Sequence, residues 1–176
     1  MTHFDLEGVC VGDAGASVFA AALDRGALPR LEYLYLRKAA IGDAGLVALA
    51  PALRRRTALS GLSLYGNPFG DEGLAALVAP PPADAPPPQA EALAQLKRLD
   101  VSSTQITDDG CAHLASRLRS GALPALAALC LEDIPASIAA IEAVYEAGPG
   151  LQEEEEEEDE DEAAGEMEED GEAGEA

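Results

Sequence analysis

The sequence predicts an α/β solenoid, a row of similar strand–turn–helix units packed side by side. Two recurring patterns support this prediction. The first is a short apolar motif, LxxLxL, in which Met, Phe or Val replaces some of the leucines. The second is Asp-x-Gly, which follows the first four copies of the motif at a constant distance. The five copies of the apolar motif begin at residues 1, 31, 59, 96 and 126.

Each apolar motif predicts a short strand, because alternate side chains of a strand point to opposite sides. The leucines therefore point into the solenoid, and the residues between them face outward on a concave surface. The concave positions predicted in this way are His3, Asp5, Glu7, Tyr33, Tyr35, Arg37, Gly61, Ser63, Tyr65, Arg98, Asp100, Ser102, Ala128, Cys130 and Glu132.

Each Asp-x-Gly predicts the start of a helix, because an aspartate near a helix N-terminus can accept bonds from the first free N–H groups. Asp13, Asp43, Asp71 and Asp108 are thus expected to cap the helices that they begin. Pro51 lies inside the second predicted helix, where proline costs about 3 kcal/mol or kinks the helix.

The ends of the repeated region differ from its middle. A Pro-rich insertion at about 80–88 lengthens the third unit and shortens its helix, and an atypical closing helix without Asp-x-Gly is expected at about 134–147. Residues 151–176 hold 16 of the 33 acidic residues and no Lys or Arg. We therefore expect a repeat domain over 1–150 and a disordered acidic tail over 151–176, which either improves solubility or binds a basic partner.

Composition excludes several function classes. A net charge of −22 argues against direct binding of nucleic acid or an anionic membrane. The sequence has neither a long apolar run nor a signal peptide, so we expect a cytoplasmic or nuclear protein. The three cysteines form no CxxC pair, His3 and His113 lie in different units, and no catalytic motif is present. No metal site, cofactor or enzymatic activity of its own is therefore predicted.

Three of the four tyrosines fall on the concave surface of neighbouring units, beside a cation. Tyr and Arg dominate the binding energy of many protein interfaces, so this grouping predicts a protein-binding site. The alternative is that the rings only cover the sheet. The residues predicted to contact a partner are Tyr33, Tyr35, Arg37, Ser63, Tyr65, Arg98 and Asp100.

The repeats resemble leucine-rich repeats of the ribonuclease-inhibitor type, which form horseshoe-shaped solenoids. The stretches at 62–73 and 96–101, together with the acidic tail, are similar to Ran GTPase-activating proteins. This resemblance implies a protein that binds Ran, or another small GTPase, in its GTP state and stimulates hydrolysis on the partner. It also implies that a turn asparagine assists the GTPase, and Asn67 is the one asparagine in the chain.

Two other interpretations stay open. Asn67 occupies a position that, in this repeat type, often bonds to the backbone of the neighbouring turn, which would make it structural. The combination of leucine repeats and acidic tail is also similar to acidic leucine-rich nuclear phosphoproteins, which bind histones and other basic proteins. A scaffold unrelated to Ran is the third possibility.

Overall fold

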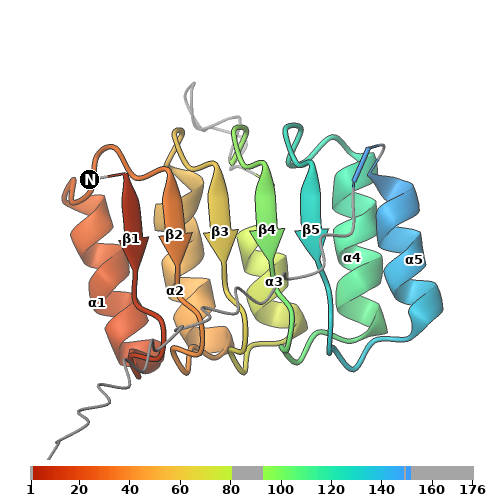
Figure 1. Cartoon of the computed structure of the whole chain (residues 1–176), viewed down its shortest axis with the longest axis horizontal. Helices are drawn as coiled ribbons and strands as arrows, with labels where there is room; N and C mark the ends of the chain where they lie inside the picture. The colour runs from red at the N-terminus through yellow and green to blue at the C-terminus, as the bar shows by residue number, and fades with distance from the viewer. Residues whose placement is uncertain (1, 81–92, 149, 152–176) are drawn as a thin grey trace, which may run out of the picture.

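The computed structural model describes residues 2–80, 93–148, 150 and 151 and confirms the α/β solenoid. Within these residues five parallel strands form one sheet in the order of the chain, and a helix follows each strand. Figure 1 shows the sheet as one layer and the helices as a second layer behind it. The strands are β1 (His3–Asp5), β2 (Tyr33–Tyr35), β3 (Gly61–Ser63), β4 (Arg98–Asp100) and β5 (Ala128–Cys130). The helices are α1 (Gly12–Asp24), α2 (Asp43–Arg54), α3 (Asp71–Leu77), α4 (Asp108–Arg119) and α5 (Ile138–Ala147).

The strand register matches the predicted repeat. Leu34 of β2 pairs with Phe4 of β1 on one side and with Leu62 of β3 on the other, and Leu99 and Leu129 continue the same row. Because every second residue faces the helices, the residues on either side of this row face away from them. The predicted concave positions within the strands therefore lie in register across the sheet.

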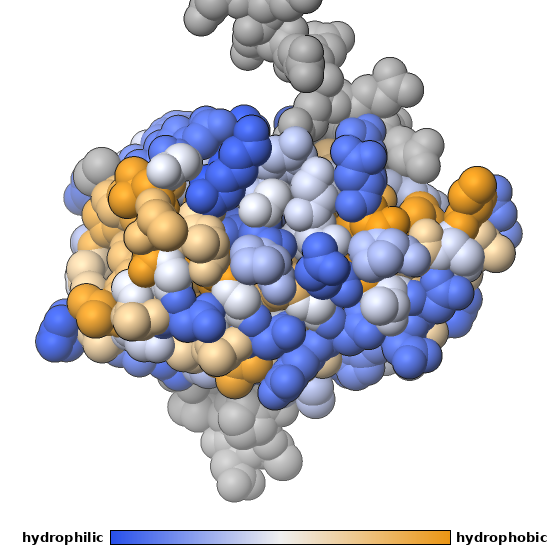
Figure 2. All heavy atoms as spheres, turned by 90° about the horizontal axis from the view of Figure 1, so that it is seen from below, coloured by the Kyte–Doolittle hydropathy of each residue, from blue (hydrophilic) through white to orange (hydrophobic). Residues whose placement is uncertain are grey.

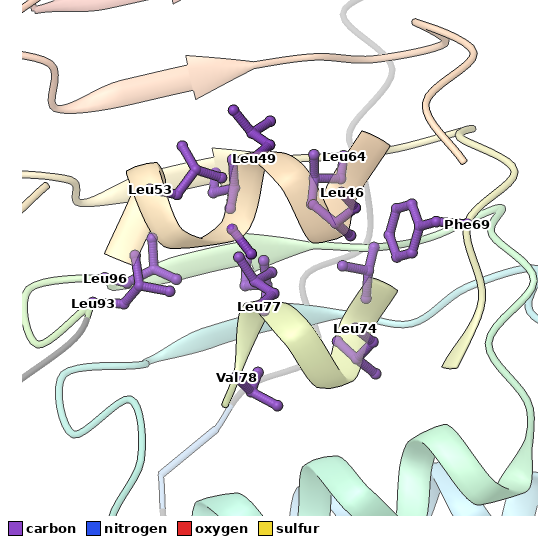
Figure 3. Close-up of a cluster of buried hydrophobic side chains, with 14 of the residues drawn as sticks. Leu46, Leu49, Leu53, Leu64, Phe69, Leu74, Leu77, Val78, Leu93 and Leu96 are labelled. Carbon is purple, nitrogen blue, oxygen red and sulfur yellow. The ribbon is translucent and has the colours of Figure 1, made fainter. Parts of the chain in front are cut away.

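Leucines from both layers meet between the sheet and the helices. Figure 3 shows side chains of α2 and α3 directed toward one another and toward Leu64 and Leu96 of the neighbouring strand segments. Leu46, Leu53 and Phe69 are fully buried in this cluster. Burial of each such side chain contributes about 1.5–3 kcal/mol, so the core forms as a continuous apolar layer shared by adjacent units.

The prediction that each aspartate caps its own helix is wrong. The Asp43 carboxylate lies in the first turn of α2, yet its Oδ1 accepts hydrogen bonds from Gly70 N (2.9 Å) and Gly73 N (2.7 Å) at the start of α3. Each aspartate therefore caps the helix of the following unit. Asp13 accepts in the same way from Gly42 and Gly45, Asp71 from the N–H and hydroxyl of Thr107, and Asp108 from those of Ser137.

The glycine of Asp-x-Gly has a matching steric reason. A Cβ atom on Gly73 would lie 3.0 Å from Asp43 Oδ1, and on Gly45 or Gly110 it would meet the preceding aspartate at still closer range. A larger residue would push the carboxylate away from the N–H groups that it accepts from. The Asp-x-Gly motif is therefore required for the contact between neighbouring units.

Arginines join the helices at their opposite ends. Arg56 donates to the carbonyl oxygen of Leu23 at the end of α1, Arg54 donates to Ala79 O (3.2 Å), and Arg117 Nε donates to Val78 O (2.9 Å). Cations in these places satisfy free carbonyls and complement the helix dipole.

The remaining irregularities follow the predicted ones in part. Helix α2 continues past Pro51 to Arg54, and α3 is only 7 residues long. Helix α5 starts at Ile138, where Ser137 Oγ accepts from Ala140 N (3.3 Å). The Pro-rich insertion at 80–88 lies, apart from residue 80, outside the described residues, as does the acidic tail from 152 onward.

Apolar side chains are exposed at the first end of the solenoid. At the end formed by β1 and α1, Val9 and Val18 are 51% and 68% exposed. Figure 2 views the protein from the edge where the strands end; apolar side chains gather at the left, over β1 and α1, and the middle is mostly hydrophilic.

None of the helices described is both long and apolar enough to cross a membrane.

We expect Asp43→Ala to lower the free energy of unfolding by about 1–2 kcal/mol, because two N–H groups of α3 lose their acceptor. Asp43→Asn keeps an acceptor oxygen and should lose less. Native-state hydrogen exchange of the alanine variant should accelerate at Gly73 in α3. If exchange instead accelerated at Gly45 in α2, the aspartate would stabilise its own helix and the inter-unit assignment would fail.

Candidate functional site: the concave face of the sheet

The strand periodicity arranges the concave side chains in three rows. The third row follows the strand ends and is kept in register by backbone bonds such as Lys38 N to Tyr65 O (2.8 Å) and Gly66 N to Ser102 O (3.0 Å). The first row is His3, Tyr33, Gly61, Arg98 and Ala128, the second is Asp5, Tyr35, Ser63, Asp100 and Cys130, and the third is Glu7, Arg37, Tyr65, Ser102 and Glu132.

Tyr33 covers the sheet. Its ring stacks on His3 with 4.5 Å between centroids and an angle of 9° between the planes. On the other side, a Cβ atom at Gly61 would lie 2.6 Å from Tyr33 Cδ1, so the ring fits only because the neighbouring strand has a glycine there. The sheet-covering alternative therefore describes this tyrosine well.

Tyr35 and Tyr65 each lie beside a cation. The Arg37 guanidinium carbon is 5.5 Å from the centre of the Tyr35 ring, and Lys38 Nζ is 5.5 Å from that of Tyr65. Contacts of this kind contribute about 0.5–1 kcal/mol when exposed. The nitrogen Nε of Arg37 is buried and has no hydrogen-bond partner among the described residues. This corner of the face thus combines two aromatic rings with a donor that lacks an acceptor.

Lys38 was not among the predicted site residues. Alternation places it on the face opposite to Arg37, but its φ of 50° lies in the left-handed region and takes it out of the strand pattern. Its position directly after the predicted strand was the one feature of the sequence that could have indicated its place beside Tyr65.

Ser63, Asp100 and Ser102 form a bonded group. Ser63 Oγ donates to Asp100 Oδ2 (2.7 Å), Asp100 Oδ1 accepts from Ser102 N (3.0 Å), and Ser102 Oγ accepts from Glu132 N (3.1 Å). All three side chains are buried. They join β3 to β4 and the turn beyond β5, whereas Arg98 at the start of β4 is exposed. Of the predicted set, the structure thus brings Ser63 and Asp100 into a hydrogen bond and places Arg37 over the ring of Tyr35.

Asn67 is 1% exposed and bonded on both amide atoms. Its Oδ1 accepts from Ala39 N (3.1 Å) and Ile41 N (3.0 Å) in the preceding unit. Its Nδ2 donates to Leu36 O (2.7 Å) and Leu64 O (2.8 Å), with a longer contact to Tyr65 O. The amide therefore joins the turns of two units, which is the structural arrangement predicted for this position.

The groups able to do chemistry are dispersed. His113 is exposed on α4, away from His3 on β1. Within the described residues, His, Cys, Asp and Glu side chains nowhere gather in a group of three that could hold a metal ion. Cys10 is exposed, while burial, and then the charges of Asp108 and Asp71, raise the pKa of the Cys111 thiol to about 11. A protonated, buried thiol is unreactive at neutral pH.

Comparison with known proteins agrees with this geometry. A family model described as a leucine-rich repeat matches residues 28–50, 59–78 and 95–115. The chain folds as a leucine-rich repeat solenoid. Comparison with curated proteins gives no significant match.

Among solved structures, 53 chains match this repeat solenoid significantly. One is described as actin-binding site 2 of leiomodin-1. It has a TM-score of 0.57 and 15% sequence identity, and the match covers 84% of this chain and 78% of that one. At this identity the likeness shows a shared fold.

Asn67→Ala should lower the free energy of unfolding by about 3 kcal/mol, because buried N–H and C=O groups in two turns lose their partners. Urea denaturation measures this loss. Ser60→Ala, which removes a weaker hydroxyl contact of 3.4 Å to Ala58 O, is the control and should change stability little. A loss below about 1 kcal/mol in Asn67→Ala would show that the amide is not essential to the solenoid.

Proposed function

We propose that this leucine-rich repeat protein binds a protein partner on the concave face of its sheet and catalyses no reaction itself. The observation that carries the proposal is the corner formed by Tyr35, Arg37 and Tyr65. The Arg37 guanidinium, whose Nε has no acceptor among the described residues, lies there over the partly buried ring of Tyr35, and Lys38 lies over that of Tyr65. Because Arg37 as a whole is only half-buried, a rotation of its side chain would bring this donor to a carbonyl or carboxylate of a partner.

The scaffold suits such a role because the site is fixed before binding. The residues of the corner come from β2 and from the turns after β2 and β3, and backbone bonds between these elements hold them in register. A tyrosine ring adds large contact area with few rotatable bonds, so little conformational entropy is lost on association. Binding energy is thus expected to concentrate on these few side chains.

We further propose a small GTPase in its GTP state, such as Ran, as the partner to test first. The support for this choice is the resemblance of the repeats and of the acidic tail to Ran GTPase-activating proteins. The buried and fully bonded Asn67 favours binding over direct assistance to the partner's catalytic centre. Actin is the comparison ligand, because the leiomodin-1 neighbour is described as an actin-binding site.

Tyr35→Ala and Tyr65→Ala should each weaken capture of the concave-face partner about tenfold, because the loss of each ring removes buried contact area. The measurement is quantitative affinity capture with the wild-type protein and both variants. Val18→Ala, on the exposed side of α1, is the control and should capture as much partner as the wild type. Equal capture by all four proteins would place the binding surface elsewhere.

Single-turnover GTP hydrolysis by Ran, with and without this protein, tests the finer proposal. We expect acceleration by the full chain and a reduced effect with Tyr35→Ala. Binding of Ran without acceleration of GTP hydrolysis would support Ran as a partner and contradict the role as an activator. Binding of actin and not of Ran would show that the partner is not a small GTPase.

A further inference from the structure

Most basic residues of the protein lie on one of its two edges. Of the 11 basic residues, only Arg37 and Lys38 lie on the edge where the strands end and the helices begin. The other edge, where helices end and strands begin, holds the rest and is here named the basic edge. Its residues are Arg25, Arg30, Arg54, Arg55, Arg56, Lys97, Arg98, Arg117 and Arg119.

Side chains of the basic edge reach from one unit to the next between α1 and α4. Arg55 pairs with Asp24 at the end of α1 (2.5 Å), Arg54 reaches Ala79 beyond α3, and Arg117 reaches Val78 from α4. Helix capping accounts for several of these cations. It does not account for Arg30 and Lys97, which are exposed and precede strands.

Positive charge is concentrated at this edge. Burial, and then the neighbouring charge of Arg55, lower the pKa of Arg54 from its ordinary value. An anion close to these guanidinium groups would favour their charged forms and offset their mutual repulsion.

The chain leaves the repeat domain at this same edge. Helix α5 ends at Ala147, and Leu151 packs against the core, with its N–H donating to Gly148 O (3.1 Å). Leu118, which lies between Arg117 and Arg119 in α4, is within 3.7 Å of a Cβ placed on Gly148. Leu151, the last described residue, therefore lies beside the basic edge, and the acidic run of the sequence begins two residues later at Glu153.

We infer that residues 153–176 bind in cis to the basic edge of the same chain. They carry 16 carboxylates and no Lys or Arg, which complements the edge in charge. An extended segment of that length spans about 80 Å, whereas four spacings between neighbouring helices cover only about 40 Å. Covalent attachment also supplies an effective concentration of about millimolar. Many weak, exposed ion pairs would then act together to hold residues 153–176 at the basic edge.

The chain supplies its own probe for this contact, because it has only two lysines, Lys97 on the basic edge and Lys38 on the opposite edge. A carbodiimide condenses a carboxylate with a lysine amine that lies next to it. We expect the full-length protein at about 0.15 M salt to join residues 153–176 to Lys97 severalfold more than to Lys38. Peptide mass spectrometry measures both products. At about 1 M salt the Lys97 product should fall severalfold, because screening removes the attraction.

A matched pair of variants separates specific attraction from simple nearness. Arg119→Gln removes one charge from the basic edge, and Arg37→Gln removes one from the opposite edge. The first should reduce the Lys97 product about twofold and the second should leave it unchanged. Arg30→Gln repeats the test at an exposed loop residue, and thermal melting checks that each variant folds.

Lys97 products that resist salt, or that fall equally in Arg119→Gln and Arg37→Gln, would overturn the inference. Such results would show that the segment meets Lys97 only because it is tethered nearby. No partner protein is present in this experiment, so its failure would leave the proposed concave-face function untouched.

Discussion

The rest of the structure depends on one carboxylate interaction between units. Asp43 belongs to α2 but accepts from two N–H groups of α3, and Asp13, Asp71 and Asp108 repeat this step along the solenoid. A buried or partly buried N–H group without an acceptor is costly, so each helix start requires the unit before it. The interaction therefore fixes the spacing of adjacent helices and keeps their N-termini at one edge.

This constraint also explains the charge pattern of the protein. Helices held parallel by the aspartates place all their N-termini on one edge and all their C-termini on the other. Acidic residues are favoured at the first edge and cations at the second, because the dipoles of the helices add in the same direction. Arg54, Arg56 and Arg117 then bond to helix ends of neighbouring units. The basic edge is thus a consequence of repeat geometry, and it is available for a second use.

The sequence predicts what depends on periodicity, but it does not predict which unit each aspartate bonds to. Rows such as Tyr33, Gly61 and Arg98 follow from the alternation of a strand, and the structure pairs them in that order. The partner of Asp43 could not be predicted, because a carboxylate at a helix start can reach its own helix or the next one with equal chemical sense. Lys38 was missed for a local reason, since its left-handed backbone breaks the alternation.

The concave face divides into side chains that hold the units together and side chains that lie over them. Ser63 and Asp100 on this face, like Asn67 in the turn beyond it, are buried in bonds between neighbouring units, so changing them alters the scaffold. Tyr35 and Tyr65 instead contact cations at the surface of the sheet. Substitution there changes the surface while the backbone register and the aspartate contacts between helices remain. A solenoid built in this way can change the surface side chains of its sheet without changing its fold, because cohesion between the units depends on other residues of the same strands.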